Sequence, residues 1–239
     1  MKPAYHSHQQ AQKRAGHHVI ELASSEIEQK LPDLDVLILV NLTNPSTESF
    51  TPEAGMNWHQ KVIDHKGCLI IDEAFMDATP EQSVICKTPK PGLIVLRSIG
   101  KIFGLAGVRL GFVWAETNVL KQLASKQDDW SVSHPARWAG AVALSDTSWQ
   151  QQQRKQLFIA SERLKLLLEN KFQARVFHTA LFAYFEHEEA LFYHWKLAGN
   201  GVLVRLFEDP LALRFGLPAS DEEWQCLEGV LGSIRVLTP

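Results

Sequence analysis

Apolar residues gather into short runs in the first part of the chain, with polar stretches of helical character between them. The predicted strands span 35–40, 68–72, 93–97 and 110–115. The first two runs are apolar enough for strands buried on both faces, as in parallel sheets. Thr51 and Pro52 predict a helix start between them, because threonine suits the N-cap and proline the first helical turn. We therefore predict an α/β fold with a mostly parallel sheet flanked by helices.

The pattern changes near residue 117, where longer helical segments replace the short apolar runs. Before the first run, we predict a helix at 4–15, closed by Gly16, and a strand at 18–22. Two domains follow from the change of pattern: 1–130, which holds the sheet, and 131–239, which holds a linking helix and a small α+β domain. The elements predicted after residue 117 are helices at 117–127, 135–172 (one helix or two) and 221–234, the last capped by Ser220, and strands at 175–177, 181–186, 202–207 and 212–216.

Composition narrows the class of protein. The chain has 239 residues, of which 45% are hydrophobic and 21% charged, with a formal net charge of -3, as in an ordinary globular domain. Without a basic excess, nucleic acid is not expected as a partner. No apolar stretch is long enough to cross a membrane and no signal peptide is recognisable, so no membrane partner is expected. Three widely spaced cysteines predict a reducing, cytoplasmic location. His6 is near His8 and His17 is next to His18, but no carboxylate or cysteine completes a ligand set, so we expect solvated or capping histidines and no metal site.

Polar side chains follow each of three predicted parallel strands. Asn44 lies in the turn after 35–40, Asp72 ends the run 68–72, and Lys101 follows 93–97. Because function collects at the carboxyl ends of parallel strands, we expect these groups at one edge of the sheet. The alternatives are structural: Asp72 as a strand-end cap and Asn44 as a turn residue before proline.

The glycine-rich segment around Lys101 is the most informative motif. Ser98 lies three positions before the lysine and Arg109 eight positions after it. An amine can hold an aldehyde cofactor, while a hydroxyl and a guanidinium group can bind a phosphate. The alternative is a solvated lysine in a glycine-rich loop.

The ordered motifs resemble those of the fold-type-I pyridoxal-phosphate enzymes, the aspartate aminotransferase superfamily. That family shows N-P-x-N-P, D-x-A-[YF], S-x-x-K and R-x-G in this order, and the resemblance covers nearly all of the chain. Within the superfamily, the segments IDEAFMDATPEQS, LRSIGKIFGLAGVRLGF and LRFGLP are similar to the threonine-phosphate decarboxylases of cobalamin biosynthesis. Histidinol-phosphate aminotransferases are close relatives of that branch.

The resemblance implies pyridoxal 5'-phosphate as cofactor and assigns roles to residues of this chain. Lys101 would form the Schiff base with the cofactor, and Asp72 would pair with the ring nitrogen. The other cofactor-binding positions would be Asn44 (ring 3-oxygen), Ser98 and Arg109 (phosphate), Ala74 and Tyr5 (opposite ring faces), and Phe75, where the family often has tyrosine. Arg214 would receive the substrate carboxylate, and Arg205 is a further candidate for the substrate end, with a surface ion pair as its alternative.

The activity implied is decarboxylation of L-threonine O-3-phosphate to (R)-1-amino-2-propanol O-2-phosphate by a homodimer. The alternatives are an aminotransferase acting on a phosphorylated amino acid such as histidinol phosphate, and a catalytically impaired fragment of the family. By resemblance, the chain lacks the family's N-terminal portion, which includes a glycine-containing loop that donates backbone N–H groups to the phosphate.

Overall fold

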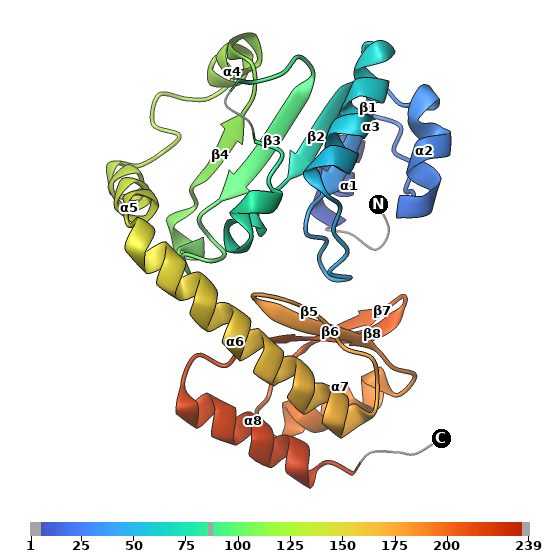
Figure 1. Cartoon of the computed structure of the whole chain (residues 1–239), viewed down its shortest axis with the longest axis vertical. Coiled ribbons are helices and arrows are strands. Elements are labelled where there is room, and N and C mark those ends of the chain that lie inside the picture. Colours follow the sequence, from blue (N-terminus) through green and yellow to red (C-terminus); the bar gives the residue numbers. More distant parts are fainter. Residues whose placement is uncertain (1–5, 86–87, 236–239) are drawn as a thin grey trace. The chain divides into compact units, whose positions relative to one another are not determined.

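The computed structural model describes residues 6–85 and 88–235. The chain divides into two compact units, Met1–Ser148 and Trp149–Pro239 (Figure 1). The sequence placed the division at 130/131, ahead of helix α5 (His134–Ser145). In the structure α5 packs on the first unit, where a Cβ added to Gly140 would lie 2.5 Å from Leu110 Cδ2.

The first unit is built on a four-stranded sheet in the order β1-β2-β3-β4 (Figure 1). β1 to β3 are parallel, and β4 is antiparallel to β3, so the prediction of a mostly parallel sheet within an α/β fold is confirmed. Val40 pairs with Asp72 and Asp72 with Leu96, which aligns the carboxyl ends of the three parallel strands. The strands are β1 (Val36–Val40), β2 (Cys68–Asp72), β3 (Leu93–Ser98) and β4 (Gly111–Trp114).

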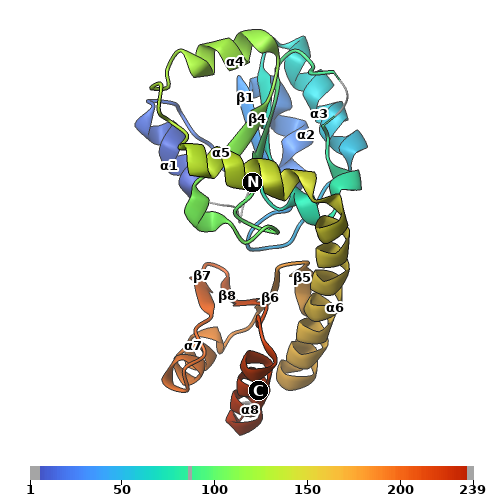
Figure 2. The ribbon, with the colours of Figure 1, turned by 90° about the vertical axis from the view of Figure 1, so that its left-hand side faces the viewer.

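Helices flank this sheet (Figure 2). Helix α3 begins as predicted, with the Thr51 hydroxyl accepting a hydrogen bond from the Ala54 amide at 3.3 Å and Pro52 in the first turn. Val62 of α3 packs with Ile27 of α2, Leu39 of β1 and other strand residues into one apolar core. The helices of this unit are α1 (His6–Arg14), α2 (Ile27–Lys30), α3 (Pro52–Asp64), α4 (Thr117–Ala124) and α5, with short 3-10 turns at Ser24–Glu26, Leu31–Asp33, Met76–Ala78, Pro80–Gln82 and Ala106–Val108.

The parallel strands are not buried equally on both faces, contrary to the sequence expectation. Leu69 and Ile71 of β2 are fully buried against the α3 side, whereas Ile70 and Asp72 on the opposite face are half-buried. β1 and β3 alternate in the same way over most of their length. Successive side chains of a strand point to opposite faces, so the sheet has one buried face and one half-open face.

The predicted strand at 18–22 is wrong, because the structure has no strand there. Ile20 is exposed and Leu22 is buried, so the segment lacks the row of buried side chains on one face that a strand of this sheet would have. The chain enters the 3-10 turn Ser24–Glu26 directly afterwards.

The second unit packs three helices on one face of an antiparallel sheet with strand order β5-β6-β8-β7 (Figure 1). Its core joins Leu168 of α6, Phe185 of β6, Tyr193 of α7 and Leu213 of β8. This arrangement is the predicted small α+β domain. The elements are α6 (Thr147–Phe172), β5 (Phe177–Thr179), β6 (Phe182–Glu186), α7 (Ala190–Gly199), β7 (Arg205–Glu208), β8 (Leu211–Gly216) and α8 (Asp221–Ser233).

Two elements of this unit differ from the sequence reading. Helix α7 received no prediction, although Ala190, Tyr193 and Leu197 share one buried helical stripe. β5 starts at Phe177, where the predicted strand ended. The predicted segment 135–172 forms two helices, separated at Asp146.

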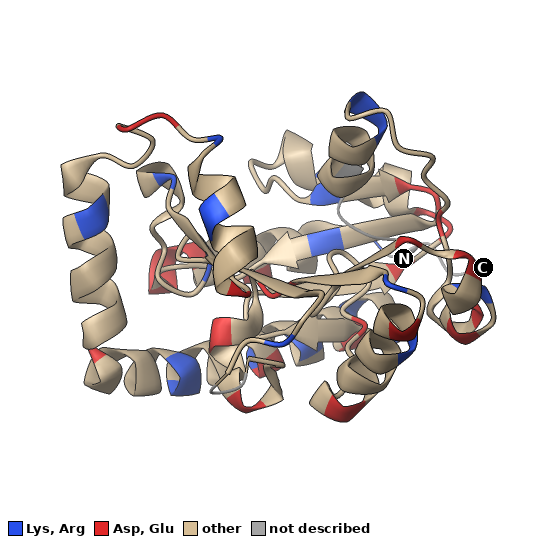
Figure 3. Ribbon diagram, turned by 90° about the horizontal axis from the view of Figure 1, so that it is seen from above, with Lys and Arg blue, Asp and Glu red and all other residues tan. Residues whose placement is uncertain are grey.

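Charged positions are spread over the elements, with Lys and Arg interspersed among Asp and Glu (Figure 3). Within the described part of the chain, no helix combines the length and apolar character needed to span a bilayer.

Candidate active site

The carboxyl ends of β1, β2 and β3 form the edge where the predicted site residues meet. The sheet ladder continues one residue past the strands, because the Asn41 amide donates to the Asp72 carbonyl at 2.9 Å and the Glu73 amide donates to the Leu96 carbonyl at 2.8 Å. Residue alternation therefore still holds at this edge, and it directs Asp72 and Ser98 to the half-open face.

Asp72 is held by two hydrogen bonds. Its Oδ1 accepts from the Ala74 amide at 2.9 Å, and its Oδ2 accepts from His8 Nε2 at 2.7 Å. The carboxylate is 15% exposed, so it is accessible from the half-open face while its orientation is fixed. A fixed, partly exposed carboxylate can pair with a protonated ring nitrogen.

His8 is a site residue that the sequence reasoning missed. It lies on α1, 64 positions before its partner, and the sequence led us to expect a solvated or capping histidine there. A usable signal was its spacing of three residues from Tyr5, which places both on one face of the predicted helix 4–15. Tyr5 itself lies outside the described residues.

Lys101 lies beside the turn that follows β2. Its Nζ is 4.9 Å from the centroid of the Phe75 ring, and its side chain is exposed. The structure thus brings Asp72, Ala74, Phe75 and Lys101 to one edge of the sheet. An exposed amine next to an aromatic ring is chemically able to condense with an aldehyde.

Buried apolar residues hold the lysine loop in place. Ile99, Ile102 and Phe103 are buried on either side of the exposed Lys101. The Gly100 amide donates to Ser98 Oγ at 3.1 Å, so the hydroxyl lies within the same turn.

Arg109 closes this loop in a left-handed conformation, with φ 56°. Its Nη1 donates to the Ala106 carbonyl at 3.3 Å and its side chain is exposed. A non-glycine residue in this region of backbone space is strained and marks a functional or packing constraint. The assignment of Ser98 and Arg109 to a phosphate stays a prediction.

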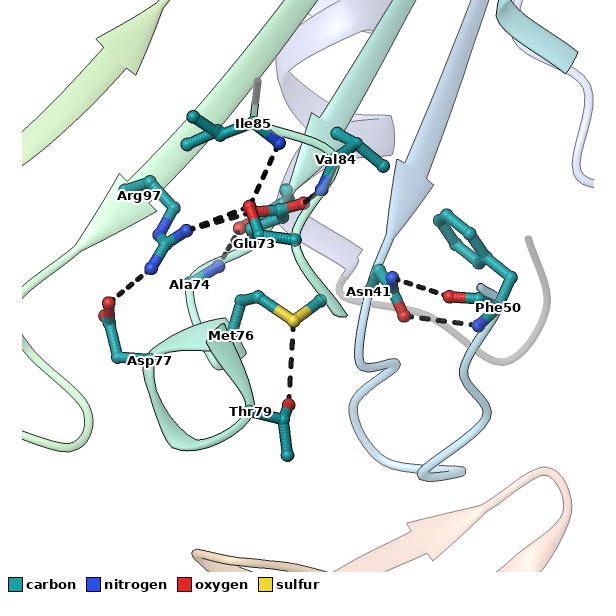
Figure 4. A network of polar contacts seen from close by, with 12 residues as sticks. Asn41, Phe50, Glu73, Ala74, Met76, Asp77, Thr79, Val84, Ile85 and Arg97 are labelled. Carbon is teal, nitrogen blue, oxygen red and sulfur yellow. Dashed lines mark hydrogen bonds and ion pairs between the residues drawn. The ribbon is translucent and has the colours of Figure 1, made fainter. Parts of the chain in front are cut away.

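The loop after β1 is fixed by a residue that the sequence reasoning did not single out. Asn41 is fully buried, and its side chain exchanges two hydrogen bonds with the backbone of Phe50 (Figure 4). Its Nδ2 donates to the Phe50 carbonyl at 3.1 Å, and its Oδ1 accepts from the Phe50 amide at 3.3 Å. Asn44 lies half-buried inside the loop closed in this way, and its role toward a ring oxygen stays a prediction.

The two predicted substrate arginines are neighbours in the second unit. Arg205 of β7 pairs in register with Arg214 of β8, and Tyr184 of β6 pairs with Arg214 from the other side. Leu213 and Phe215 point into the core, so Arg214 lies on the face opposite the helices.

Burial and the neighbouring positive charge of Arg205 disfavour the charged form of Arg214. Burial, and secondarily the guanidinium of Arg205, lowers the pKa of Arg214. Burial and the Glu186 carboxylate raise the pKa of the Tyr184 phenol above its usual range. A bound anion would relieve the repulsion between the two guanidinium groups.

A metal ion has no ligand set in the part of the chain that is described: no group of three His, Cys, Asp or Glu side chains is placed to share one.

Comparison with known proteins places the chain in a family. Residues 1–223 match the family model of aminotransferase class I and II. The chain is 42% identical over 231 residues to threonine-phosphate decarboxylase of Pseudomonas aeruginosa, which covers 97% of this chain and 70% of that protein. It is 34% identical over 211 residues to threonine-phosphate decarboxylase of Sinorhizobium sp, which covers 83% of this chain and 62% of that protein.

Among solved structures, the fold is similar to that of histidinol-phosphate aminotransferase from Sinorhizobium meliloti in complex with pyridoxal-5'-phosphate. The TM-score is 0.83 at 18% identity, and the match covers 96% of this chain and 68% of the other. The family model covers most of the chain, and the relative from Pseudomonas aeruginosa is 42% identical to it. The chain therefore belongs to the aminotransferase class I and II family.

Proposed function

We propose that this protein uses pyridoxal 5'-phosphate to decarboxylate L-threonine O-3-phosphate, forming (R)-1-amino-2-propanol O-2-phosphate in cobalamin biosynthesis. The observation that carries the proposal is the position of the Lys101 amine beside the Phe75 ring. Phe75 belongs to the turn that begins at Asp72, whose carboxylate is fixed by the Ala74 amide. The choice of substrate rests on the 42% identity to a threonine-phosphate decarboxylase.

The residues at the edge fit this cofactor. A primary amine, a fixed carboxylate, and a hydroxyl and a guanidinium on one loop are the groups that its aldehyde, ring nitrogen and phosphate require. Lys101 would hold the aldehyde carbon, Asp72 the ring nitrogen, Asn44 the ring 3-oxygen, and Ser98 and Arg109 the phosphate. When bound, the cofactor supplies an electron-withdrawing ring that accepts the electron pair of the bond broken at the substrate's α-carbon.

Two side chains would manage protons in this reaction. Asp72 would stabilise a proton on the ring nitrogen, because its carboxylate is held in place by the Ala74 amide and His8. Lys101 Nζ would hold the cofactor aldehyde and would also be the group that gives a proton to the α-carbon of the substrate.

Arg214 and Arg205 would hold the anionic ends of the substrate. Threonine phosphate carries a carboxylate and a phosphate, and two adjacent guanidinium groups bind such anions in a bidentate manner. We assign the carboxylate to Arg214 and the other end of the substrate to Arg205.

We also propose that the protein acts in the cytoplasm as a homodimer. Three dispersed cysteines support a reducing compartment. Exposed large apolar side chains of the first unit, Trp130 at 80% and Trp138 at 72%, support association with a second copy.

Transamination of a phosphorylated amino acid such as histidinol phosphate is the second candidate, and it would use the same residues. It is supported by the likeness of fold to a histidinol-phosphate aminotransferase. A catalytically impaired member of the family is the third.

One titration separates these candidates. Purified protein mixed with pyridoxal phosphate should develop a visible absorbance band that is absent in Lys101→Ala, and an impaired protein would show no such band. Threonine phosphate is then added with and without an oxo acid. Release of carbon dioxide without the oxo acid supports decarboxylation, and strict dependence on the oxo acid contradicts it.

A further inference from the structure

A polar network joins Glu73 and Asp77, in the turn after β2, to Arg97 and Val84 (Figure 4). Its centre is Glu73, whose side chain has no exposed surface. Because Glu73 directly follows Asp72, alternation directs it to the opposite, buried face of the sheet. No residue of this network belongs to the cofactor or substrate positions discussed above.

Glu73 accepts hydrogen bonds from three groups, two of them in the loop 83–84 and one in β3. Its Oε2 accepts from Ser83 Oγ at 2.6 Å and from Arg97 Nη1 at 3.0 Å, and its Oε1 accepts from the Val84 amide at 2.8 Å. Arg97 also donates to Ser83 Oγ at 3.3 Å and forms an ion pair with Asp77. One guanidinium group thus contacts both ends of the segment 73–84.

The position of Arg97 in the chain connects this network to the lysine loop. Arg97 is the penultimate residue of β3, one position before Ser98 and four before Lys101. Its partners Glu73 and Asp77 belong to the turn after β2, on which Phe75 contacts Lys101. The side chain of Arg97 therefore joins the strand that leads to the lysine with the turn that carries its neighbours.

The geometry of the guanidinium group is essential to this contact. Arg97 is planar at its end and donates along two directions, to Glu73 through Nη1 and to Asp77 through Nη2. A lysine ammonium could neutralise the buried carboxylate, but it lacks the fork that spans two acceptors. Charge compensation and positioning can therefore be separated by substitution.

We propose that Arg97 is a positioning residue, which fixes the turn bearing Asp72, Ala74 and Phe75 against the strand that leads to Lys101. The inference rests on the proposed function, because the positioned residues are those assigned to the cofactor. It assigns no contact between Arg97 and cofactor or substrate.

Three variants of the full chain and one control test the proposal. Arg97→Met removes the contact, and Arg97→Lys keeps the charge without the fork. The double variant Glu73→Gln/Arg97→Met removes both buried charges, while the glutamine can still accept from the Val84 amide. The control is Lys61→Met, which breaks an exposed ion pair with Glu28 in the same unit.

Two measurements are made on each folded variant. The first is the affinity for pyridoxal phosphate, from the visible absorbance band. The second, on the cofactor-free protein, is hydrogen exchange of the Ala74 and Val84 amides, which donate to Asp72 and Glu73. Unfolding midpoints are recorded alongside, so that a loss of folded protein is not mistaken for a loss of affinity.

We expect Arg97→Lys and the double variant to keep unfolding midpoints near that of the wild type while their cofactor affinity falls by about 10- to 100-fold. The Ala74 and Val84 amides should exchange faster in both, and Lys61→Met should leave affinity and exchange unchanged. Wild-type affinity and exchange in the folded Arg97 variants would overturn the proposal, as would recovery of both stability and affinity in the double variant. If the Arg97→Met chain does not fold, the other two variants decide.

Failure of the proposed function has a different signature. A wild-type protein without any cofactor band contradicts the decarboxylase proposal. The exchange rates of the cofactor-free chains then still decide whether Arg97 orders the turn.

Discussion

The two faces of the parallel sheet end in side chains of different kinds. On the buried face, the apolar rows of β1, β2 and β3 terminate in Asn41, Glu73 and Arg97, which bond to loops or to one another. On the half-open face, β2 and β3 terminate in Asp72 and Ser98. One face thus fixes the loops, and the other presents groups that can meet a ligand.

This difference explains how a half-open edge can keep a defined geometry. Each loop that leaves a strand has backbone N–H and C=O groups outside the ladder, and burial without partners would be costly. Asn41 and Glu73 supply those partners from the buried side. Asp72 and Lys101 can then remain accessible without the loops around them becoming mobile.

The largest expected effect is a difference in stability between two substitutions on opposite faces of β2. Ile71→Ala should lower the free energy of unfolding by about 2–5 kcal/mol, because Ile71 is fully buried and the change leaves a cavity. Ile70→Ala, on the half-open face, should cost only about 1 kcal/mol. Urea unfolding of both variants measures the difference, and equal losses would contradict the assignment of the faces.

A change on the half-open face should affect function instead of stability. Asp72→Asn preserves the shape and an oxygen that accepts from the Ala74 amide, but it removes the charge. We expect decarboxylation of threonine phosphate to fall about 100-fold or more, with the unfolding midpoint close to that of the wild type. A variant that unfolds early and keeps its activity per folded molecule would reverse the comparison.

Substitution of Asn41, whose side chain bonds to the Phe50 backbone and closes the loop after β1, should give a smaller effect. Asn41→Ala leaves the Phe50 amide and carbonyl without these side-chain partners and should cost about 1–3 kcal/mol of stability. Asn41→Asp keeps the acceptor for the Phe50 amide but sets a second carboxylate oxygen against the Phe50 carbonyl, so it should cost at least as much as the alanine change. Chemical unfolding gives both values. An alanine variant as stable as the wild type would contradict the role of Asn41 in fixing this loop.

The parallel sheet could be predicted from the sequence because its strands are short, strongly apolar runs that end in turns. The strand at 18–22 was wrong because Ile20 and Leu22 gave a local alternation without a partner strand. Helix α7 received no prediction, although Tyr193 and Leu197 lie on a helical stripe, because a short helix can be recognised only weakly from its period.

The residues that support the site could not be found in the same way. Glu73 and Arg97 are 24 positions apart, and His8 and Asp72 are 64 apart, so only the fold brings them together. The motif itself suggested Lys101 and Asp72, since their residue types carry chemistry. Arg97 has no such signal, because an arginine beside a strand end is compatible with a surface position.

The central claim is that Lys101 is the amine that binds the cofactor aldehyde at this edge. The direct test is borohydride reduction of the protein mixed with pyridoxal phosphate, which converts an imine into a stable secondary amine, followed by peptide mass spectrometry. We predict one modified peptide, with the added mass on Lys101, and no modification at that site in Lys101→Ala. Modification of a different lysine as the main product, or of none, would contradict the account.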